Sequence, residues 1–206
     1  MENQDTNWDN YFYPGTNVLK NKFGITDAAT LRQVEADVTF KRLTELYANP
    51  IDGNFDTKHY QDIHRYLFGD VYDFAGEFRS VDMRKDFYFT TNREIENSLN
   101  VVLDEMHNDF LKCRTYQDFV IFLAEFYYDI LTVHPFREGN GRTTREFLRE
   151  FVDKYIRDYK LKWSRMNREQ LNLGVKYGHI GKSMLEIEFE KGLVSRSEEL
   201  NRESRQ

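Results

Sequence analysis

The sequence predicts an all-α domain with one small β-hairpin. Only 3 prolines and 11 glycines occur in 206 residues, which favours long regular elements over a turn-rich β architecture. Apolar residues recur at helical spacing along most of the chain. Aromatic side chains make up 16% of the residues, so we expect a packed core and not a disordered chain.

Helix boundaries follow from capping residues and breakers. Thr26 and Asp27 are typical of a helix start, and Pro50 and Gly53 end the first pattern. The segment 115–131 is apolar nearly all round, which is typical of a helix at the centre of a bundle. The patterns predict helices at 27–47, 56–69, 93–111, 115–131, 141–159, 167–178 and 182–193.

Residues 79–91 show an alternation of apolar and polar residues that is typical of β-strands. Val81 and Met83 alternate with polar neighbours, and three aromatic residues follow Lys85 and Asp86. This pattern predicts a short hairpin with its turn near Lys85.

The whole chain, 1–206, is expected to form a single domain. We expect a loose N-terminal arm at 1–10, a core at about 11–194 and a charged C-terminal tail at 195–206. The single cysteine, Cys113, excludes an internal disulfide and fits a reducing compartment. No apolar run suits a membrane span and no signal-peptide pattern opens the chain, so we expect a cytoplasmic protein that uses no membrane.

The formal net charge of −6 argues against direct binding of nucleic acid. A nucleotide site would therefore have to be a local patch of positive groups and backbone N–H groups.

The segment 134–145 contains such a patch beside a candidate base. Pro135 disfavours helical geometry at His134, so this histidine lies where a buried helix ends. A histidine with an ordinary pKa near ~6.5 can be neutral at physiological pH and accept a proton from an attacking hydroxyl.

Gly139, Asn140 and Gly141 open the next helix. Glycines let a ligand approach the backbone, and the N–H groups and positive dipole end of the helix point at the same place. Arg142 and Arg145 project from one face of that helix and suit a polyphosphate. Glu138 adds a single carboxylate, the usual arrangement for Mg²⁺ beside phosphates.

This segment resembles the signature of the Fic family, His-Pro-Phe-any-Asp/Glu-Gly-Asn-Gly-Arg-any-any-Arg, and agrees at every specified position. Residues 71–79 resemble the family's segment before its active-site flap. Residues 85–91 resemble the flap, although Asp86 stands where the family often has glycine. Tyr13 and Pro14 with residues 22–25 resemble the start of compact bacterial toxin-like Fic proteins.

The resemblance implies a Fic fold and a protein adenylyltransferase that uses ATP and Mg²⁺. His134 would then be the general base, Phe136 the anchor of the loop and Glu138 the Mg²⁺ ligand. The remaining signature residues would bind the phosphates: Gly139, Asn140 and Gly141 as an anion hole, Arg142 at the β-phosphate and Arg145 at the γ-phosphate end. The flap residues Lys85, Phe87 and Phe89 would dock an extended target segment by main-chain pairing. Lys85 is also interpretable as an ordinary solvated hairpin residue.

The resemblance also implies partners. Many family members are silenced by a helix with the pattern Ser/Thr-any-any-any-Glu-Gly/Asn. The near match at 195–200 has Leu200 at the last position and is most simply a polar tail. We therefore expect a small separate antitoxin to supply the inhibitory glutamate. A target protein, type II topoisomerase subunits by analogy, and a homodimer are expected on the same ground.

Three other functions are weighed against this one. Doc-type members of the same fold transfer a phosphate, but they lack the third small position and the second arginine, which are Gly141 and Arg145 here. Another nucleotide could replace ATP. A non-catalytic module would be marked by loss of His134 or Glu138, and both are present. Zinc is excluded because no second His or Cys completes a site with these two residues. His59, His64, His107 and His179 also lack metal-ligand spacing, so we interpret them as surface histidines or as histidines with satisfied hydrogen bonds.

Overall fold

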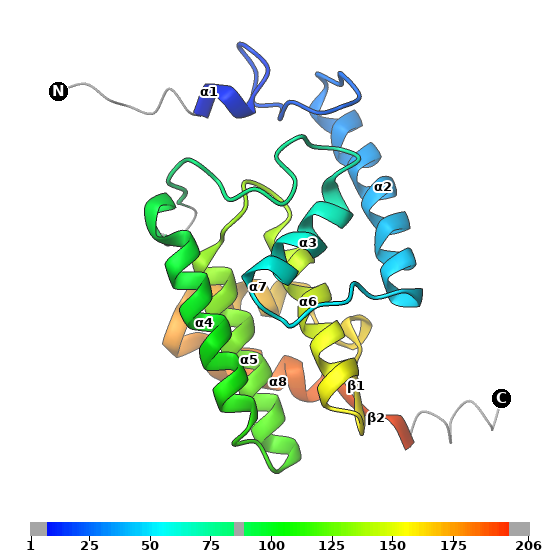
Figure 1. Ribbon diagram of the computed structural model, residues 1–206, viewed down its shortest axis with the longest axis vertical. Coiled ribbons are helices and arrows are strands. Elements are labelled where there is room, and N and C mark those ends of the chain that lie inside the picture. Colours follow the sequence, from blue (N-terminus) through cyan, green and yellow to red (C-terminus); the bar gives the residue numbers. More distant parts are fainter. Residues whose placement is uncertain (1–7, 85–88, 198–206) are drawn as a thin grey trace.

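The computed structural model describes residues 8–84 and 89–197, and within these ranges the chain is a helical bundle with one two-stranded sheet (Figure 1). The α-helices are α1 (Trp8–Tyr11), α2 (Ala28–Ala48), α3 (Thr57–Phe68), α4 (Ile95–Phe110), α5 (Tyr116–Val133), α6 (Asn140–Tyr155), α7 (Arg168–Tyr177) and α8 (Lys182–Gly192). Short 3-10 turns lie at Asn92–Glu94, Trp163–Arg165 and Gly178–Gly181. The strands are β1 (Tyr159–Leu161) and β2 (Leu193–Ser195).

Side-chain caps start several of the predicted helices. The Asp27 carboxylate accepts from the N–H of Thr30 at 2.7 Å, and the Asp56 carboxylate accepts from the N–H of His59 at 2.8 Å. Thr115 and Asp118 form a reciprocal capping box at the start of α5. These contacts satisfy N–H groups that have no partner inside the helix, which confirms the predicted starts.

The prediction of a helix over 141–159 was too long. α6 ends at Tyr155, and Tyr159–Leu161 instead pairs antiparallel with Leu193–Ser195. Local apolar spacing cannot reveal this pair, because three-residue strands are too short for a period and their partners lie far apart in sequence.

A backbone contact crosses the segment 79–91, where a hairpin is predicted. The N–H of Phe89 donates to the carbonyl of Met83 at 3.4 Å. The turn at 85–88 lies outside the described residues, so the hairpin itself stays a prediction.

Where the structure describes them, both ends of the chain contact the rest of the fold, and the division into arm, core and tail stays a prediction. α1 covers part of the expected loose arm, and the Tyr11 hydroxyl lies 3.2 Å from that of Ser80. Ser195 ends β2, and Arg196 donates to the Tyr159 carbonyl at 2.9 Å. Residues 1–7 and 198–206 lie outside the described ranges.

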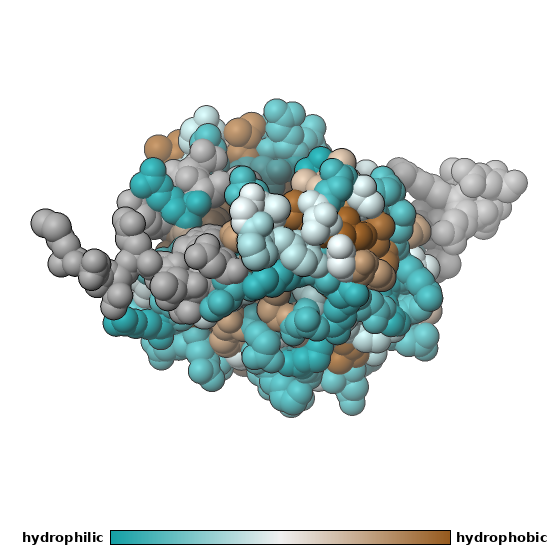
Figure 2. All heavy atoms as spheres, turned by 90° about the horizontal axis from the view of Figure 1, so that it is seen from above, coloured by the Kyte–Doolittle hydropathy of each residue, from teal (hydrophilic) through white to brown (hydrophobic). Residues whose placement is uncertain are grey.

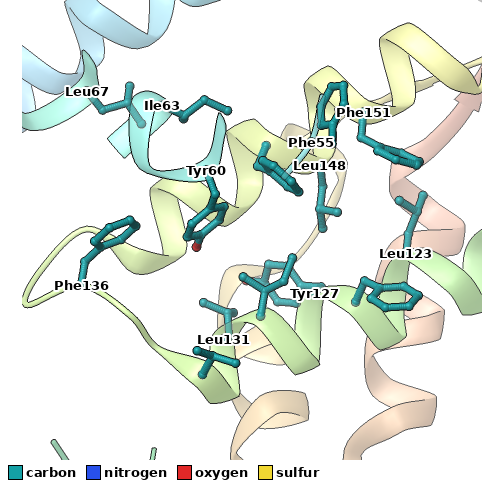
Figure 3. Close-up of a cluster of buried hydrophobic side chains, with 14 of the residues drawn as sticks. Phe55, Tyr60, Ile63, Leu67, Leu123, Tyr127, Leu131, Phe136, Leu148 and Phe151 are labelled. Atoms are coloured by element: carbon teal, nitrogen blue, oxygen red, sulfur yellow. The ribbon is translucent and has the colours of Figure 1, made fainter. Parts of the chain in front are cut away.

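The core is centred on α5 and α6. α5 packs against α4, α6 and α8, while α3 lies between α2 and α6. Buried aromatic rings fill the contacts: Phe55 meets Phe147 and Phe151 edge to face, and Tyr60 stacks on Phe136 (Figure 3). This packing reaches the loop between α5 and α6 through Phe136.

Hydrophilic residues cover most of the face shown in Figure 2, with hydrophobic residues in smaller groups. Among the described residues, no helix is both long and apolar enough to cross a membrane.

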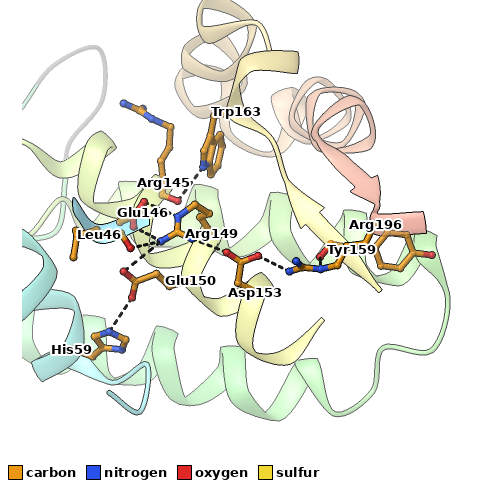
Figure 4. A network of polar contacts seen from close by, with 10 residues as sticks. All are labelled: Leu46, His59, Arg145, Glu146, Arg149, Glu150, Asp153, Tyr159, Trp163 and Arg196. Atoms are coloured by element: carbon orange, nitrogen blue, oxygen red, sulfur yellow. Dashed lines mark hydrogen bonds and ion pairs between the residues drawn. The ribbon is translucent and has the colours of Figure 1, made fainter. Parts of the chain in front are cut away.

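A buried ionic network ties α6 to its neighbours (Figure 4). The Arg149 guanidinium contacts Glu146 at 2.5 Å and Asp153 at 2.6 Å, and its side chain is only 5% exposed. Asp153 also pairs with Arg196 at 2.6 Å, which joins the end of β2 to α6. Burial raises the pKa of Glu146 to about 6.

Arg149→Ala should lower the free energy of unfolding by about 3–5 kcal/mol, because it leaves buried carboxylates without their cation. Urea denaturation followed by circular dichroism measures the loss. Replacing the exposed Arg157 with alanine is the control and should change stability by less than about 0.5 kcal/mol. Equal effects of the two substitutions would contradict the role of the network.

Candidate active site

One cavity of about 900 Å³ collects the signature residues. Its wall includes His134, Glu138, Gly139, Asn140, Gly141, Arg142 and Arg145. α2 and α7 contribute further lining, and Phe89 lines the cavity beside Met83 and Arg84. The volume suits a nucleotide-sized ligand. Lys85 and Phe87 lie outside the described residues, so their predicted flap role stays a prediction.

His134 occupies the C-terminal end of α5 in a left-handed conformation, with φ of 49°. The ring Nδ1 lies 3.2 Å from the Leu131 carbonyl oxygen. A carbonyl oxygen only accepts, so this contact places the proton of the neutral ring on Nδ1 and makes Nε2 the basic nitrogen. Phe89 stacks on the imidazole with ring centroids 3.9 Å apart, which fixes the plane of the ring.

Arg79 holds the backbone around His134. Its Nε donates to the His134 carbonyl at 2.8 Å, and its Nη1 donates to the Val81 carbonyl at 2.7 Å. Nη2 donates to the Thr90 carbonyl. The side chain is buried, and desolvation lowers its pKa. One guanidinium therefore joins the end of α5 to both sides of the segment that resembles a flap. Sequence reasoning did not single out this residue.

The loop after His134 is anchored by Phe136 and His64. Phe136 is fully buried and stacks on the His64 ring at 3.7 Å. His64 Nδ1 accepts from the Gly76 N–H at 2.7 Å, so Nε2 carries the proton and donates to the Glu138 carbonyl at 2.9 Å. Burial lowers the pKa of His64 to about 3, which keeps the ring neutral. His64 was predicted to be a surface or satisfied histidine, and it is a satisfied one.

Asn140 closes the same loop with its side chain. Oδ1 accepts from the Phe136 N–H at 2.8 Å, and Nδ2 donates to the Phe136 carbonyl at 2.7 Å. The amide is thereby used within the protein. A contribution of Asn140 to a bound anion would come from its backbone N–H, at the positive end of α6.

Gly139 is required by its conformation and by its neighbour. Its φ is 83°, and a Cβ at this position would lie 2.4 Å from the Phe68 ring. Such a contact is impossible without displacement, so the backbone here can approach both Phe68 and a ligand only as glycine.

Glu138 presents a carboxylate to the cavity, with its side chain 44% exposed. Oε1 accepts from the Gly139 N–H at 3.0 Å and lies 3.5 Å from Arg142 Nη2. No group of three or more His, Cys, Asp or Glu residues suited to a metal occurs in the part of the chain that the structure describes. One carboxylate in a nucleotide-sized cavity fits Mg²⁺, which takes its remaining ligands from water and substrate oxygens.

The two arginines enter the cavity from successive turns of α6. Arg142 lies over the Phe68 ring at 4.6 Å and contacts Glu35 on α2 at 2.5 Å. Arg145 extends away from the Arg149 network (Figure 4), and its pKa is lowered by burial. Trp163 Nε1 donates to the Arg145 carbonyl at 3.1 Å, which supports this turn of the helix.

The cavity is locally cationic although the chain carries a net charge of −6. Among the described residues, the cations in its lining are Arg84, Arg137, Arg142, Arg145, Arg168 and Lys176, whereas the acids are Glu138 and Glu169. Such a lining favours a polyanion of small size. Sequence reasoning missed Arg168 and Lys176 because α7 joins the cavity through folding and carries no local motif.

Gly139→Ala should destabilise the fold more than Gly15→Ala, which is the matched control. Both glycines have a positive φ, 83° and 72°, but an added Cβ at Gly15 meets nothing within 4 Å. The clash with Phe68 should add about 1–3 kcal/mol to the loss of unfolding free energy. Equal losses of unfolding free energy in the two variants, measured by urea denaturation, would show that the Phe68 ring moves aside without an energetic cost, and would contradict this prediction.

The stability difference between wild type and His64→Gln should narrow as the pH falls. Burial lowers the pKa of His64 from 6.5 to about 3 in the folded state. Neutral His64 therefore contributes to stability at pH values above 6.5, its pKa in the unfolded chain, and this contribution is lost as the pH falls toward 3. At about 1.4 kcal/mol per pH unit, the difference should shrink by about 2 kcal/mol between about pH 6.5 and about pH 5. Urea denaturation at several pH values tests this, with the exposed His179→Gln as control. A difference that stays constant with pH would contradict it.

Comparisons with known proteins identify the family of this chain. The model of the Fic/DOC family matches residues 54–152. The chain is 31% identical over 188 residues to the "probable protein adenylyltransferase Fic" of Salmonella typhimurium, covering 90% of this chain and 92% of that protein. It is 34% identical over 179 residues to the protein adenylyltransferase VbhT of Bartonella schoenbuchensis, covering 86% of this chain but 37% of that longer protein.

A solved structure shows the same fold. The N-terminal Fic domain of a VirB-translocated Bep effector protein from Bartonella quintana, solved with bound ADP, superposes with a TM-score of 0.84 and 26% identity. The match covers 93% of this chain and 97% of that one. Signature, fold and near full-length similarity together show that this chain belongs to the Fic/DOC family.

Proposed function

We propose that this chain is a protein adenylyltransferase that transfers AMP from ATP to a Ser, Thr or Tyr hydroxyl of another protein. The observation that carries the proposal is the placement of a histidine, with Nε2 as its basic nitrogen, in the same cavity as a helix start and two arginines. The names of the Salmonella and Bartonella relatives and the ADP in the Bartonella quintana domain support it.

Each signature residue receives a role in this reaction. His134 Nε2 accepts the hydroxyl proton as the oxygen attacks the α-phosphorus. A new oxygen–phosphorus bond forms, the bond between the α-phosphorus and the bridging oxygen breaks, and pyrophosphate leaves with the electron pair. Backbone N–H groups at Asn140 and Gly141 would face the phosphates, and that of Gly139, which donates to Glu138 Oε1 at 3.0 Å, would join them by exchanging this partner for a phosphate oxygen. Arg142 binds the β-phosphate, and Arg145 binds the γ-phosphate end.

Glu138 would hold Mg²⁺, which neutralises charge on the phosphates when it is bound. The protein itself contributes by holding the reacting groups in place and by supplying fixed positive charge around the phosphates. Arg79, His64 and Asn140 hold the loop so that base and phosphate cradle keep one geometry.

The biological setting proposed is the toxin half of a toxin–antitoxin pair in the cytoplasm. The support is the resemblance to toxin-like Fic proteins and the Leu200 that departs from the inhibitory pattern. A separate antitoxin would then supply the inhibitory glutamate. Type II topoisomerase subunits as targets and a homodimer stay predictions from that resemblance.

His134→Ala should abolish transfer and keep nucleotide binding. The purified chain is incubated with lysate and ATP labelled at the α- or the γ-phosphate. Wild type should label protein from the α-label, and the variant should label it at least about 10²-fold more slowly, because the general base is lost. Calorimetry with ADP should give similar affinities for both.

His179→Ala removes an exposed histidine and should behave as wild type. Protein labelled from the γ-phosphate would show phosphotransfer instead. The absence of label in either form, with ADP still bound, would point to a non-catalytic module or a silenced enzyme. Full activity of His134→Ala would overturn the assignment of the base.

A further inference from the structure

Glu35, on α2, contacts the active-site arginine Arg142 from a distant part of the chain. Its Oε1 accepts from Arg142 Nη2 at 2.5 Å, and Thr39, one turn later on α2, accepts from Nη1 at 3.2 Å. The side chain of Glu35 is 13% exposed, so water weakens this pair less than a surface ion pair. A guanidinium carries five N–H donors, so these two contacts orient Arg142 and leave others for a ligand.

Tyr72 holds the second oxygen of Glu35. Its buried hydroxyl donates to Glu35 Oε2, and its ring stacks on Phe74 at 4.7 Å. Burial, followed by the contact with Glu35, raises the pKa of Tyr72, so the phenol stays protonated and remains a donor. Glu35 is therefore fixed at both oxygens, by Tyr72 on one side and by Arg142 on the other.

A second carboxylate competes for the same arginine. Glu138 Oε1 lies 3.5 Å from Arg142 Nη2, the nitrogen that contacts Glu35. Glu138 is the more exposed of the two carboxylates and lies farther away, so the pair with Glu35 is the stronger one. Without Glu35, Arg142 would be drawn to Glu138, and each would neutralise the other.

We propose that Glu35, fixed by Tyr72, is a positioning residue that holds Arg142 toward the phosphates and away from Glu138. This inference rests on the proposed function, since it assigns Arg142 to the β-phosphate. Glu35 thereby acts on nucleotide binding through Arg142, and on Mg²⁺ by leaving the Glu138 carboxylate available.

α2 offers a matched control. Glu45 accepts from Arg42 Nη1 at 2.8 Å and from the Tyr66 hydroxyl at 3.0 Å, so it has the same kinds of partner as Glu35. Neither Arg42 nor Glu45 lines the cavity. Glu45→Gln thus breaks another arginine–glutamate–tyrosine contact on the same helix, a more exposed one, without touching the site.

The test compares the affinities for ADP and AMP by calorimetry in Mg²⁺, because only ADP has a β-phosphate. Glu35→Gln should weaken ADP binding about tenfold, because a charged hydrogen bond is lost. It should also raise the Mg²⁺ concentration at which ADP binding is half-maximal. AMP binding should not change. Tyr72→Phe should act in the same direction but less strongly, and Glu45→Gln should leave both ligands unchanged.

A double variant shows whether Glu35 acts through the arginine. On an Arg142→Ala background, Glu35→Gln should cause no further loss of ADP affinity. Thermal unfolding of each variant separates this effect from misfolding, and if Glu35→Gln does not fold, Tyr72→Phe provides the same comparison.

Equal weakening of ADP and AMP, or tighter ADP binding by Glu35→Gln, would overturn the inference. A further loss of ADP affinity on the Arg142→Ala background would also overturn it. If wild type binds neither nucleotide, the proposed function itself fails. If wild type binds ADP more tightly than AMP and Glu35→Gln shows the same ratio of affinities, the role of Glu35 is refuted and the proposed function is not.

Discussion

The backbone between α5 and α6 is held by buried side chains, and the candidate site depends on this constraint. Arg79 binds the His134 carbonyl, Asn140 binds both polar groups of Phe136, and His64 binds the Glu138 carbonyl. A sharp turn between two core helices would otherwise leave these groups unsatisfied away from water, at a cost of about 1–3 kcal/mol each. The same contacts define where His134 and the start of α6 lie.

This arrangement separates the residues that hold the loop from those that face a ligand. Asn140 belongs to the family signature, yet its amide closes the loop and is not turned to a phosphate. Arg79 and Arg142 are both arginines near the cavity, but Arg79 meets backbone carbonyls whereas Arg142 meets carboxylates and a ring. A residue type in a motif therefore indicates a site without specifying which atoms perform the chemistry.

The described lining of the cavity carries an excess of positive charge. Cations from α6 and α7 outnumber acids there, although the whole chain is acidic. Glu35 on α2 pairs with Arg142 at 2.5 Å, while Glu138 on the loop lies 3.5 Å from the same nitrogen. Arg142 Nη2 contacts both carboxylates. In the proposed function, Glu35 on α2 would therefore affect both phosphate binding by Arg142 and Mg²⁺ binding by Glu138.

Local sequence was sufficient for the helices with strong caps, for the break at His134 and for the contiguous signature, because capping, proline sterics and helical periodicity act within a few residues. It was insufficient for the β1–β2 pair, for Arg79, and for the contributions of Glu35, Arg168 and Lys176. These residues lie far along the chain from the signature and meet it after the helices pack. Their roles come from burial and distance in space, which no short stretch of sequence encodes.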